Sequence, residues 1–178
     1  MHWKNSGPLA NAVSPTARPG WIVRIHLLAV GTRMPAWVVA GYQEYSKRLP
    51  RECSLQLTEI PPAKRNKSLT PDQARQQEGK AMLAALPKDC LVVALDVPGR
   101  SWGTEELSKR LQGWLAGGRD VALLVGGPDG LSKDCLARAD LRWSLSALTY
   151  PHALVRVVVA EQLYRAWTLG TGHPYHRS

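Results

Sequence analysis

Two rhythms of hydrophobic and polar positions alternate along the chain, and each predicts one kind of element. Short apolar runs that end at Gly or Pro are typical of strands, whereas apolar residues three or four positions apart are typical of helices. Strands are predicted at residues 22–30, 55–60, 91–95, 121–125 and 141–144. Helices are predicted at residues 36–49, 70–86, 107–115, 132–139 and 151–169. The chain is therefore expected to alternate strands with helices.

The character of the strands points to an α/β fold. The runs at 91–95 and 121–125 are apolar throughout, as expected of parallel strands that helices cover on both faces. The helical pattern near Thr70 opens with Pro71, which is a helix-start signal because the first helical N–H needs no partner. We expect a mostly parallel sheet flanked by helices.

The length fits one domain. The chain has 178 residues, within the roughly 100–200 that a domain commonly spans. Residues 1–20 lack periodic apolar positions and contain three prolines and two glycines, so they are predicted to be a disordered extension. Residues 21–178 are predicted to form the single domain.

The charge of the chain favours an anionic partner. The formal net charge is +9, and the first twenty residues supply Lys4 and Arg18 with no acid, which leaves +7 for the rest. Excess positive charge attracts polyanions, and nucleic acid is the commonest such partner of a basic protein. The charge therefore favours a nucleic-acid partner, although many basic proteins bind none.

Three cysteines stand far apart in the sequence. Cys53, Cys90 and Cys135 form no C-x-x-C pair, so neither a disulfide framework nor a zinc site is expected. A reducing cytoplasm is the predicted location, because no secretory signal and no stretch long enough to span a membrane is found.

Candidate binding residues follow the predicted strands, because ligands of open α/β sheets bind beyond the carboxyl ends of the strands. The segments are 95–99, 126–130 and 145–152. Gly126 and Gly127 would allow a ligand close to the backbone, and an ordinary tight turn is the alternative. The segment is neither G-x-G-x-x-G nor a Walker loop, which disfavours a dinucleotide fold and nucleotide hydrolysis.

Basic and aromatic residues near the end of the chain are further candidates. His152 and Arg156 lie one helical turn apart, and structural and ligand-binding roles remain open for both. Glu161 and Arg165 have the spacing of a surface ion pair. The tail at 173–178 combines an aromatic ring, imidazoles and a guanidinium, the groups that RNA recognition uses, although most tails are merely solvated.

Five motifs, in order, resemble the RlmH family over about residues 23–177. They are AVGT, LDVPG, LLVGGPDGLS, WSLSALTYPHALVRVVVAEQLYRAW and HPYHR. The resemblance implies a SPOUT-type α/β fold with a deep C-terminal trefoil knot, paired as a homodimer. Family members begin near a strand that Val23 opens here, so a start codon read as Val23 is our hypothesis for the preceding extension.

The resemblance also implies an activity, which is S-adenosylmethionine-dependent methylation of N3 of a pseudouridine in 23S ribosomal RNA on the assembled ribosome. No metal is expected, because alignment and proton removal suffice when the methyl group is already activated. The cofactor-binding residues implied are Leu95, Gly126, Leu145, Ser146, Ala147, Leu148, Thr149 and Tyr150. The candidates for substrate positioning or proton handling are Tyr175, His176 and Arg177, with His152 in reserve.

Three alternatives remain at this point. The first is a non-catalytic RNA-binding protein that keeps the fold, and the intact loop motifs count against it. The second is a SPOUT methyltransferase of transfer RNA, which we disfavour because the chain has no additional RNA-binding domain. The third, a flavodoxin-like enzyme, would need a phosphate loop after the first strand, where residues 31–35 contain one glycine.

Overall fold

The computed structural model describes residues 22–64 and 68–177, with side chains as far as Tyr175. The predictions for residues 1–20 therefore lie outside the described residues. The described strands form one five-stranded sheet in the order β2-β1-β4-β3-β5, and all neighbours pair in parallel. The strands are β1 (Val23–Val30), β2 (Cys53–Ile60), β3 (Leu91–Ser101), β4 (Val121–Val125) and β5 (Leu141–Ser144). The predicted mostly parallel α/β fold is confirmed.

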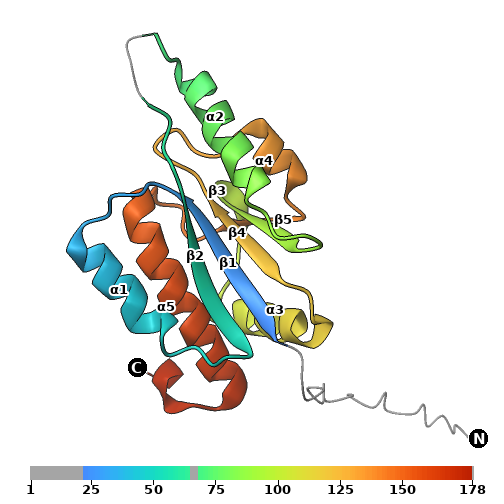
Figure 1. The fold of residues 1–178 in the computed structure, drawn as a ribbon. Helices are drawn as coiled ribbons and strands as arrows, with labels where there is room; N and C mark the ends of the chain where they lie inside the picture. Colours follow the sequence, from blue (N-terminus) through green and yellow to red (C-terminus); the bar gives the residue numbers. More distant parts are fainter. Residues whose placement is uncertain (1–21, 65–67, 178) are drawn as a thin grey trace, which may run out of the picture.

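Helices cover both faces of this sheet (Figure 1). They are α1 (Ala36–Ser46), α2 (Pro71–Ala84), α3 (Thr104–Gly117), α4 (Lys133–Arg138) and α5 (His152–Thr171), and a 3₁₀ turn at Pro174–Arg177 follows. Helices α1, α3 and α5 pack on one face, and α2 and α4 pack on the other. No described helix is both long and apolar enough to cross a membrane.

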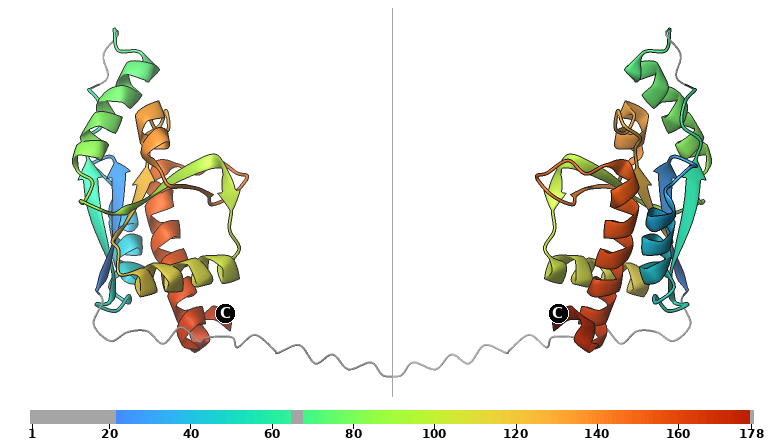
Figure 2. Two further views of the ribbon diagram at one scale, coloured as in Figure 1. Left: turned by 90° about the vertical axis from the view of Figure 1, so that its right-hand side faces the viewer. Right: turned by 90° about the vertical axis from the view of Figure 1, so that its left-hand side faces the viewer.

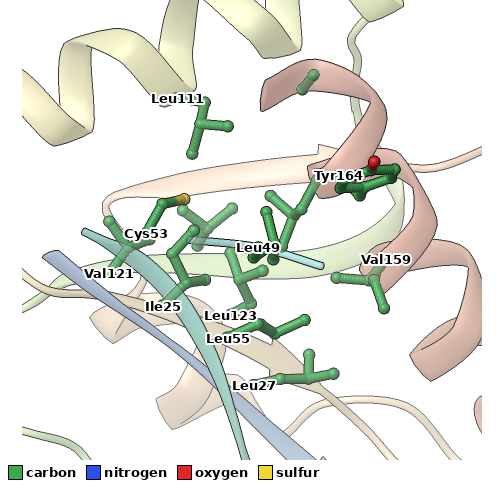
Figure 3. Packing of buried hydrophobic residues seen from close by; sticks show 14 of the residues in the cluster. Ile25, Leu27, Leu49, Cys53, Leu55, Leu111, Val121, Leu123, Val159 and Tyr164 are labelled. Carbon is green, nitrogen blue, oxygen red and sulfur yellow. The ribbon is translucent and has the colours of Figure 1, made fainter. Parts of the chain in front are cut away.

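The two-sided cover explains the continuous apolar strands. In β1, Ile25 and Leu27 belong to the core under α1, α3 and α5, whereas Leu28 and Val30 belong to the core under α2 and α4. Successive side chains of a strand point to opposite faces, so both sets must be apolar. Figure 3 shows the first of these cores, in which Ile25 and Leu27 belong to the same cluster as Leu111 of α3 and Val159 of α5.

Local chemistry sets two element boundaries. Helix α2 begins at Pro71 because the Thr70 hydroxyl accepts a hydrogen bond from the Gln73 amide, while the Gln73 side chain accepts one from the Thr70 amide. The predicted end of the third strand at Leu95 is wrong. β3 continues to Ser101, because the pairing with β5 resumes at Arg100 after an irregularity.

All five strands run in the same direction, so their carboxyl ends meet at one edge of the sheet. Two neighbouring regions of this edge matter for function. One lies beyond β3, β4 and β5, and the other lies beyond β1 and β2. Helix α5 begins at this edge and runs away from it along the sheet (Figures 1 and 2).

Candidate functional site

A cavity of about 650 Å³ opens beyond the carboxyl ends of β3, β4 and β5. Three loops line it, and the start of α5 closes it on one side. These loops are the three segments that the sequence singled out. We call this space the cofactor cavity, after the role that the sequence predicts for its walls.

The irregular segment within β3 forms the first wall of the cofactor cavity. Leu95, Asp96 and Val97 line the cavity where the ladder with β5 is interrupted. A Cβ on Gly99 would lie 2.8 Å from the carbonyl oxygen of Asp96 and 3.0 Å from the backbone of Trp143. Glycine at this position is therefore what lets the irregular segment close against β5.

A tight turn after β4 forms the next wall. The Gly130 amide donates to the Gly127 carbonyl at 3.0 Å, and Gly130 has a φ of +82°, a conformation that glycine adopts without strain. A Cβ on Gly126 would lie 2.7 Å from both the Gly130 oxygen and the Leu131 nitrogen. The backbone of this turn is thus packed closely on itself and exposed to the cavity.

The segment after β5 forms the third wall. The Ser144 hydroxyl donates to the Ser146 carbonyl at 3.0 Å, and the Leu148 amide donates to the Ser146 hydroxyl at 3.0 Å. Behind it, the Trp143 ring is buried and stacks on Trp102 with ring centroids 5.0 Å apart. Local hydrogen bonds and a rigid aromatic backing therefore hold this segment in shape.

Seven of the eight predicted cofactor-binding residues line the cavity, and Ala147 does not. The seven are Leu95, Gly126, Leu145, Ser146, Leu148, Thr149 and Tyr150. Cofactor binding by these residues stays a prediction. The wall also includes Asp96, Pro128 and Trp143, which were outside the predicted set. Asp96 and Pro128 lay within the segments identified after the strands, whereas nothing in its position marked Trp143.

His152 and Arg156 have different surroundings although they lie one turn apart. His152 lines the cofactor cavity. Arg156 is only 1% exposed, and it donates to Glu59 Oε1 at 2.6 Å and to the Gly31 carbonyl at 2.6 Å. Arg156 therefore holds the loop after β1 in place and does not face an RNA phosphate. Of the two roles left open for Arg156, the structural one applies.

A second cavity of about 530 Å³ lies next to the first, beyond β1 and β2. The two cavities share Pro128 and His152 in their linings. The loop after β1, residues 30–34, forms much of the wall of the second cavity, and Glu78 of α2 faces it. Sequence reasoning missed Glu78. A signal was present, because Ala74, Glu78 and Met82 are spaced four apart and the flanking two are buried core residues.

The tail lies at the far end of α5 from both cavities. The twenty residues of α5 separate the tail from the cavities, a length of roughly 30 Å at the usual rise per residue. Tyr175 packs on Tyr164 with ring centroids 4.8 Å apart, and its hydroxyl donates to Glu161 at 3.2 Å. Burial raises the pKa of Tyr175 to about 12. The side chains of His176 and Arg177 lie outside the described residues.

The predicted ion pair on α5 is present and is part of this cluster. Arg165 lies 2.7 Å from Glu161, and its guanidinium lies 5.1 Å from the centre of the Tyr175 ring. Both side chains of the pair are largely covered. The pair therefore anchors the 3₁₀ turn against α5.

The structure shows no assembled metal site among the residues it describes. No group of three or more His, Cys, Asp or Glu side chains there has an arrangement that could hold a metal ion. Cys53, Cys90 and Cys135 are free thiols and all are buried. Burial raises the pKa of all three, to about 12 for Cys53.

Comparison with known proteins identifies the family. A family model described as "Predicted SPOUT methyltransferase" matches residues 23–176, so the chain is a methyltransferase of the SPOUT class. A protein of Thioalkalivibrio sulfidiphilus is 64% identical over 155 residues, which are 87% of this chain and 99% of that protein. One of Alkalilimnicola ehrlichii is 60% identical over 156 residues, which are 88% and 100%. Both are named "Ribosomal RNA large subunit methyltransferase H". The chain belongs to this RlmH family.

A solved structure supports the fold alone. A probable methylase family protein of Haemophilus influenzae Rd KW20 superposes with a TM-score of 0.52 at 14% identity, covering 86% of this chain and 69% of that one. The arrangement of sheet and helices is thus shared with a protein of remote sequence.

Proposed function

We propose that the protein transfers a methyl group from S-adenosylmethionine to N3 of a pseudouridine in large-subunit ribosomal RNA. The observation that carries the proposal is the cofactor cavity, whose three walls are built by segments of the motifs that resemble the RlmH family. The relatives named as ribosomal RNA large subunit methyltransferases match almost end to end. The net charge of +9 suits an RNA substrate.

The cavity is suited to a nucleoside-containing cofactor. Its volume of about 650 Å³ lies within the roughly 300–1,000 Å³ of small-molecule sites. Leu95, Val97 and Leu148 supply apolar surface for a ring, and the turn at Gly126 brings backbone groups close to the cavity. Ser146 and Thr149 add hydroxyl groups. We infer that the loops hold the cofactor chiefly through their backbone.

S-adenosylmethionine would supply a methyl group already activated by its sulfonium. The protein then has to orient N3 of the base, exclude water and accept the N3 proton. His152 is the candidate nearest the cavities for the proton, because its Nε2 lies beside Gly31, between the two spaces. An imidazole nitrogen is a proton acceptor when neutral.

The distant tail supports a homodimer. Tyr175 lies at the far end of a twenty-residue helix from the cofactor cavity of its own chain, too far for direct contact with a substrate there. We infer that Tyr175, His176 and Arg177 act in catalysis at the cavity of a second copy. The assembled ribosome in the cytoplasm is the proposed substrate.

The trefoil knot implied by the resemblance is also part of the proposal. The sheet order puts β3 between β4 and β5, so the chain that leaves β4 must cross β3 to reach β5. In a trefoil knot the chain after this crossing would also pass through a loop formed earlier in the sequence. In such a knot, α5 would be the C-terminal segment that keeps the three loops of the cofactor cavity together.

The experiment incubates the protein with radiolabelled S-adenosylmethionine and ribosomes from a strain that lacks the endogenous activity. Assembled ribosomes, separated large subunits and bulk transfer RNA are tested in parallel. The proposal predicts label in large-subunit RNA, with assembled ribosomes as the preferred substrate. Label in transfer RNA would instead support the transfer-RNA methyltransferase, and absence of cofactor binding would support a non-catalytic RNA-binding protein.

A further inference from the structure

The second cavity contains a buried carboxylate oxygen without a partner. Glu78 is 3% exposed, and its Oε1 accepts a hydrogen bond from the Ala63 amide at 3.0 Å. Its other oxygen, Oε2, is buried and has no hydrogen-bond partner among the described residues. A buried carboxylate oxygen that lacks a partner is costly, and native proteins rarely keep one without a function.

The position of this oxygen is well defined. The Ala63 amide holds one end of the carboxylate, and a Cβ on Gly127 would lie 3.0 Å from Oε2. Glycine at position 127 thus leaves room for the carboxylate beside the turn after β4. The free oxygen therefore lies beside Gly127, which lines the cofactor cavity, while Glu78 as a residue lines the second cavity.

The cavity that Glu78 lines has a volume of about 530 Å³, within the range of small-molecule sites. The second cavity borders the cofactor cavity through Pro128 and His152. Met34 supplies an apolar side chain and Arg33 a cation at its wall. A base placed here would have one edge toward the shared boundary and another edge toward Glu78.

We propose that the second cavity receives the target base and that Glu78 Oε2 accepts a hydrogen bond from N1–H of pseudouridine. The inference rests on the proposed function. In pseudouridine the ribose is bonded to C5, so N1 keeps a hydrogen, and N1 and N3 flank the same C2 carbonyl. When N3 is directed at the shared boundary, N1–H is the neighbouring donor. Glu78 is then a residue that determines substrate specificity.

This contact would distinguish pseudouridine from uridine. With the ribose bond and N3 in the same places, uridine presents C5–H where pseudouridine presents N1–H. A carboxylate gains a strong hydrogen bond from N–H and none of comparable strength from C–H. Binding sites that rely on such a group reject an analogue that lacks it.

The variant Glu78→Gln tests this contact because the amide has a single carbonyl oxygen. That oxygen is needed by the Ala63 amide, which leaves the NH₂ group where Oε2 was. An NH₂ group donates and cannot accept from N1–H. We expect kcat/KM on pseudouridine to fall by about tenfold or more, the usual effect of losing a hydrogen bond to a charged group.

The assay compares ribosomes that carry pseudouridine at the target position with ribosomes from a strain in which that position stays uridine. Wild-type protein should favour pseudouridine, and Glu78→Gln should lose most of this preference with little change on uridine. The matched control is Asp72→Asn, which removes one charge from the exposed first turn of the same helix and should leave the preference intact.

Three results would overturn the inference. The first is an equal kcat/KM of the wild-type protein on both kinds of ribosome. This result needs no variant, so the inference can be tested even when Glu78→Gln melts below the assay temperature. An equal fall on both substrates would assign Glu78 to N3 proton removal or to folding instead. If the wild-type protein methylates neither ribosome, the proposed function itself fails, and the inference fails with it.

Discussion

Gly126 offers a sharp test of the cofactor cavity, because its neighbours are backbone atoms that cannot swing aside. In Gly126→Ala the new Cβ would lie 2.7 Å from the Gly130 oxygen and 2.7 Å from the Leu131 nitrogen. The turn after β4 must therefore open before the variant can pack. Opening the turn displaces the backbone groups that line the cavity.

The size of the effect follows from the cost of overpacking. An extra methyl group in a closely packed site costs about 1–3 kcal/mol. If the turn moves to relieve this strain, cofactor binding must supply a similar free energy to return the turn to its wild-type geometry. A loss of about 1.4–2.8 kcal/mol corresponds to a Kd for S-adenosylmethionine that is about ten- to a hundredfold higher.

Isothermal titration calorimetry with S-adenosylmethionine measures this Kd directly. The matched control is Gly113→Ala, since nothing lies within 4 Å of a Cβ at Gly113 in α3, and its Kd should equal that of the wild type. The reasoning is refuted if Gly126→Ala binds the cofactor with the wild-type Kd while its melting temperature is also unchanged.

Three further predictions concern stability and reactivity. Glu59→Gln leaves Arg156 buried with carbonyl partners only, so the free energy of unfolding should fall by about 2 kcal/mol. This is less than the roughly 3–5 kcal/mol of a fully buried pair because Glu59 is 38% exposed. Urea denaturation measures the change, and an unchanged midpoint would contradict the prediction. Gly79→Ala would press a Cβ against Ser132, the N-cap of α4, and should lower stability by about 1–3 kcal/mol. Gly113→Ala should instead raise stability by about 0.5–1 kcal/mol, and thermal melts measure both changes. Burial raises the pKa of Cys53 to about 12, and only the thiolate attacks iodoacetamide. Cys53 should therefore resist iodoacetamide at pH 8 in the folded protein and react with it in urea. Rapid labelling of the folded protein would refute the burial.

The elements that the sequence predicted well are those with strong periodic patterns. The run at Val121–Val125 is buried at every position and could hardly be other than an internal strand. The helix near Thr70 was marked by its cap and by Pro71. The end of β3 could not be predicted, because Arg100 pairs with Trp143 of β5, a strand that lies much later in the chain.

The same contrast holds for the candidate site. The rule that ligands bind at the carboxyl ends of parallel strands pointed to Gly126 and the segment after β5, because both directly follow predicted strands. The spacing of Tyr175 along the chain could not show that α5 carries it away from the cavity. The sequence pattern of α2 also could not show that Glu78, one polar residue in that helix, lies beside the turn that follows β4.

Identification of the methylated nucleoside tests the central claim most directly. Ribosomes treated with the wild-type protein or with Gly126→Ala would be digested to nucleosides and analysed by mass spectrometry against synthetic standards. The account predicts N3-methylpseudouridine from large-subunit RNA with the wild-type protein and much less with the variant. A methyl group on another nucleoside, or equal product from both proteins, would contradict the account.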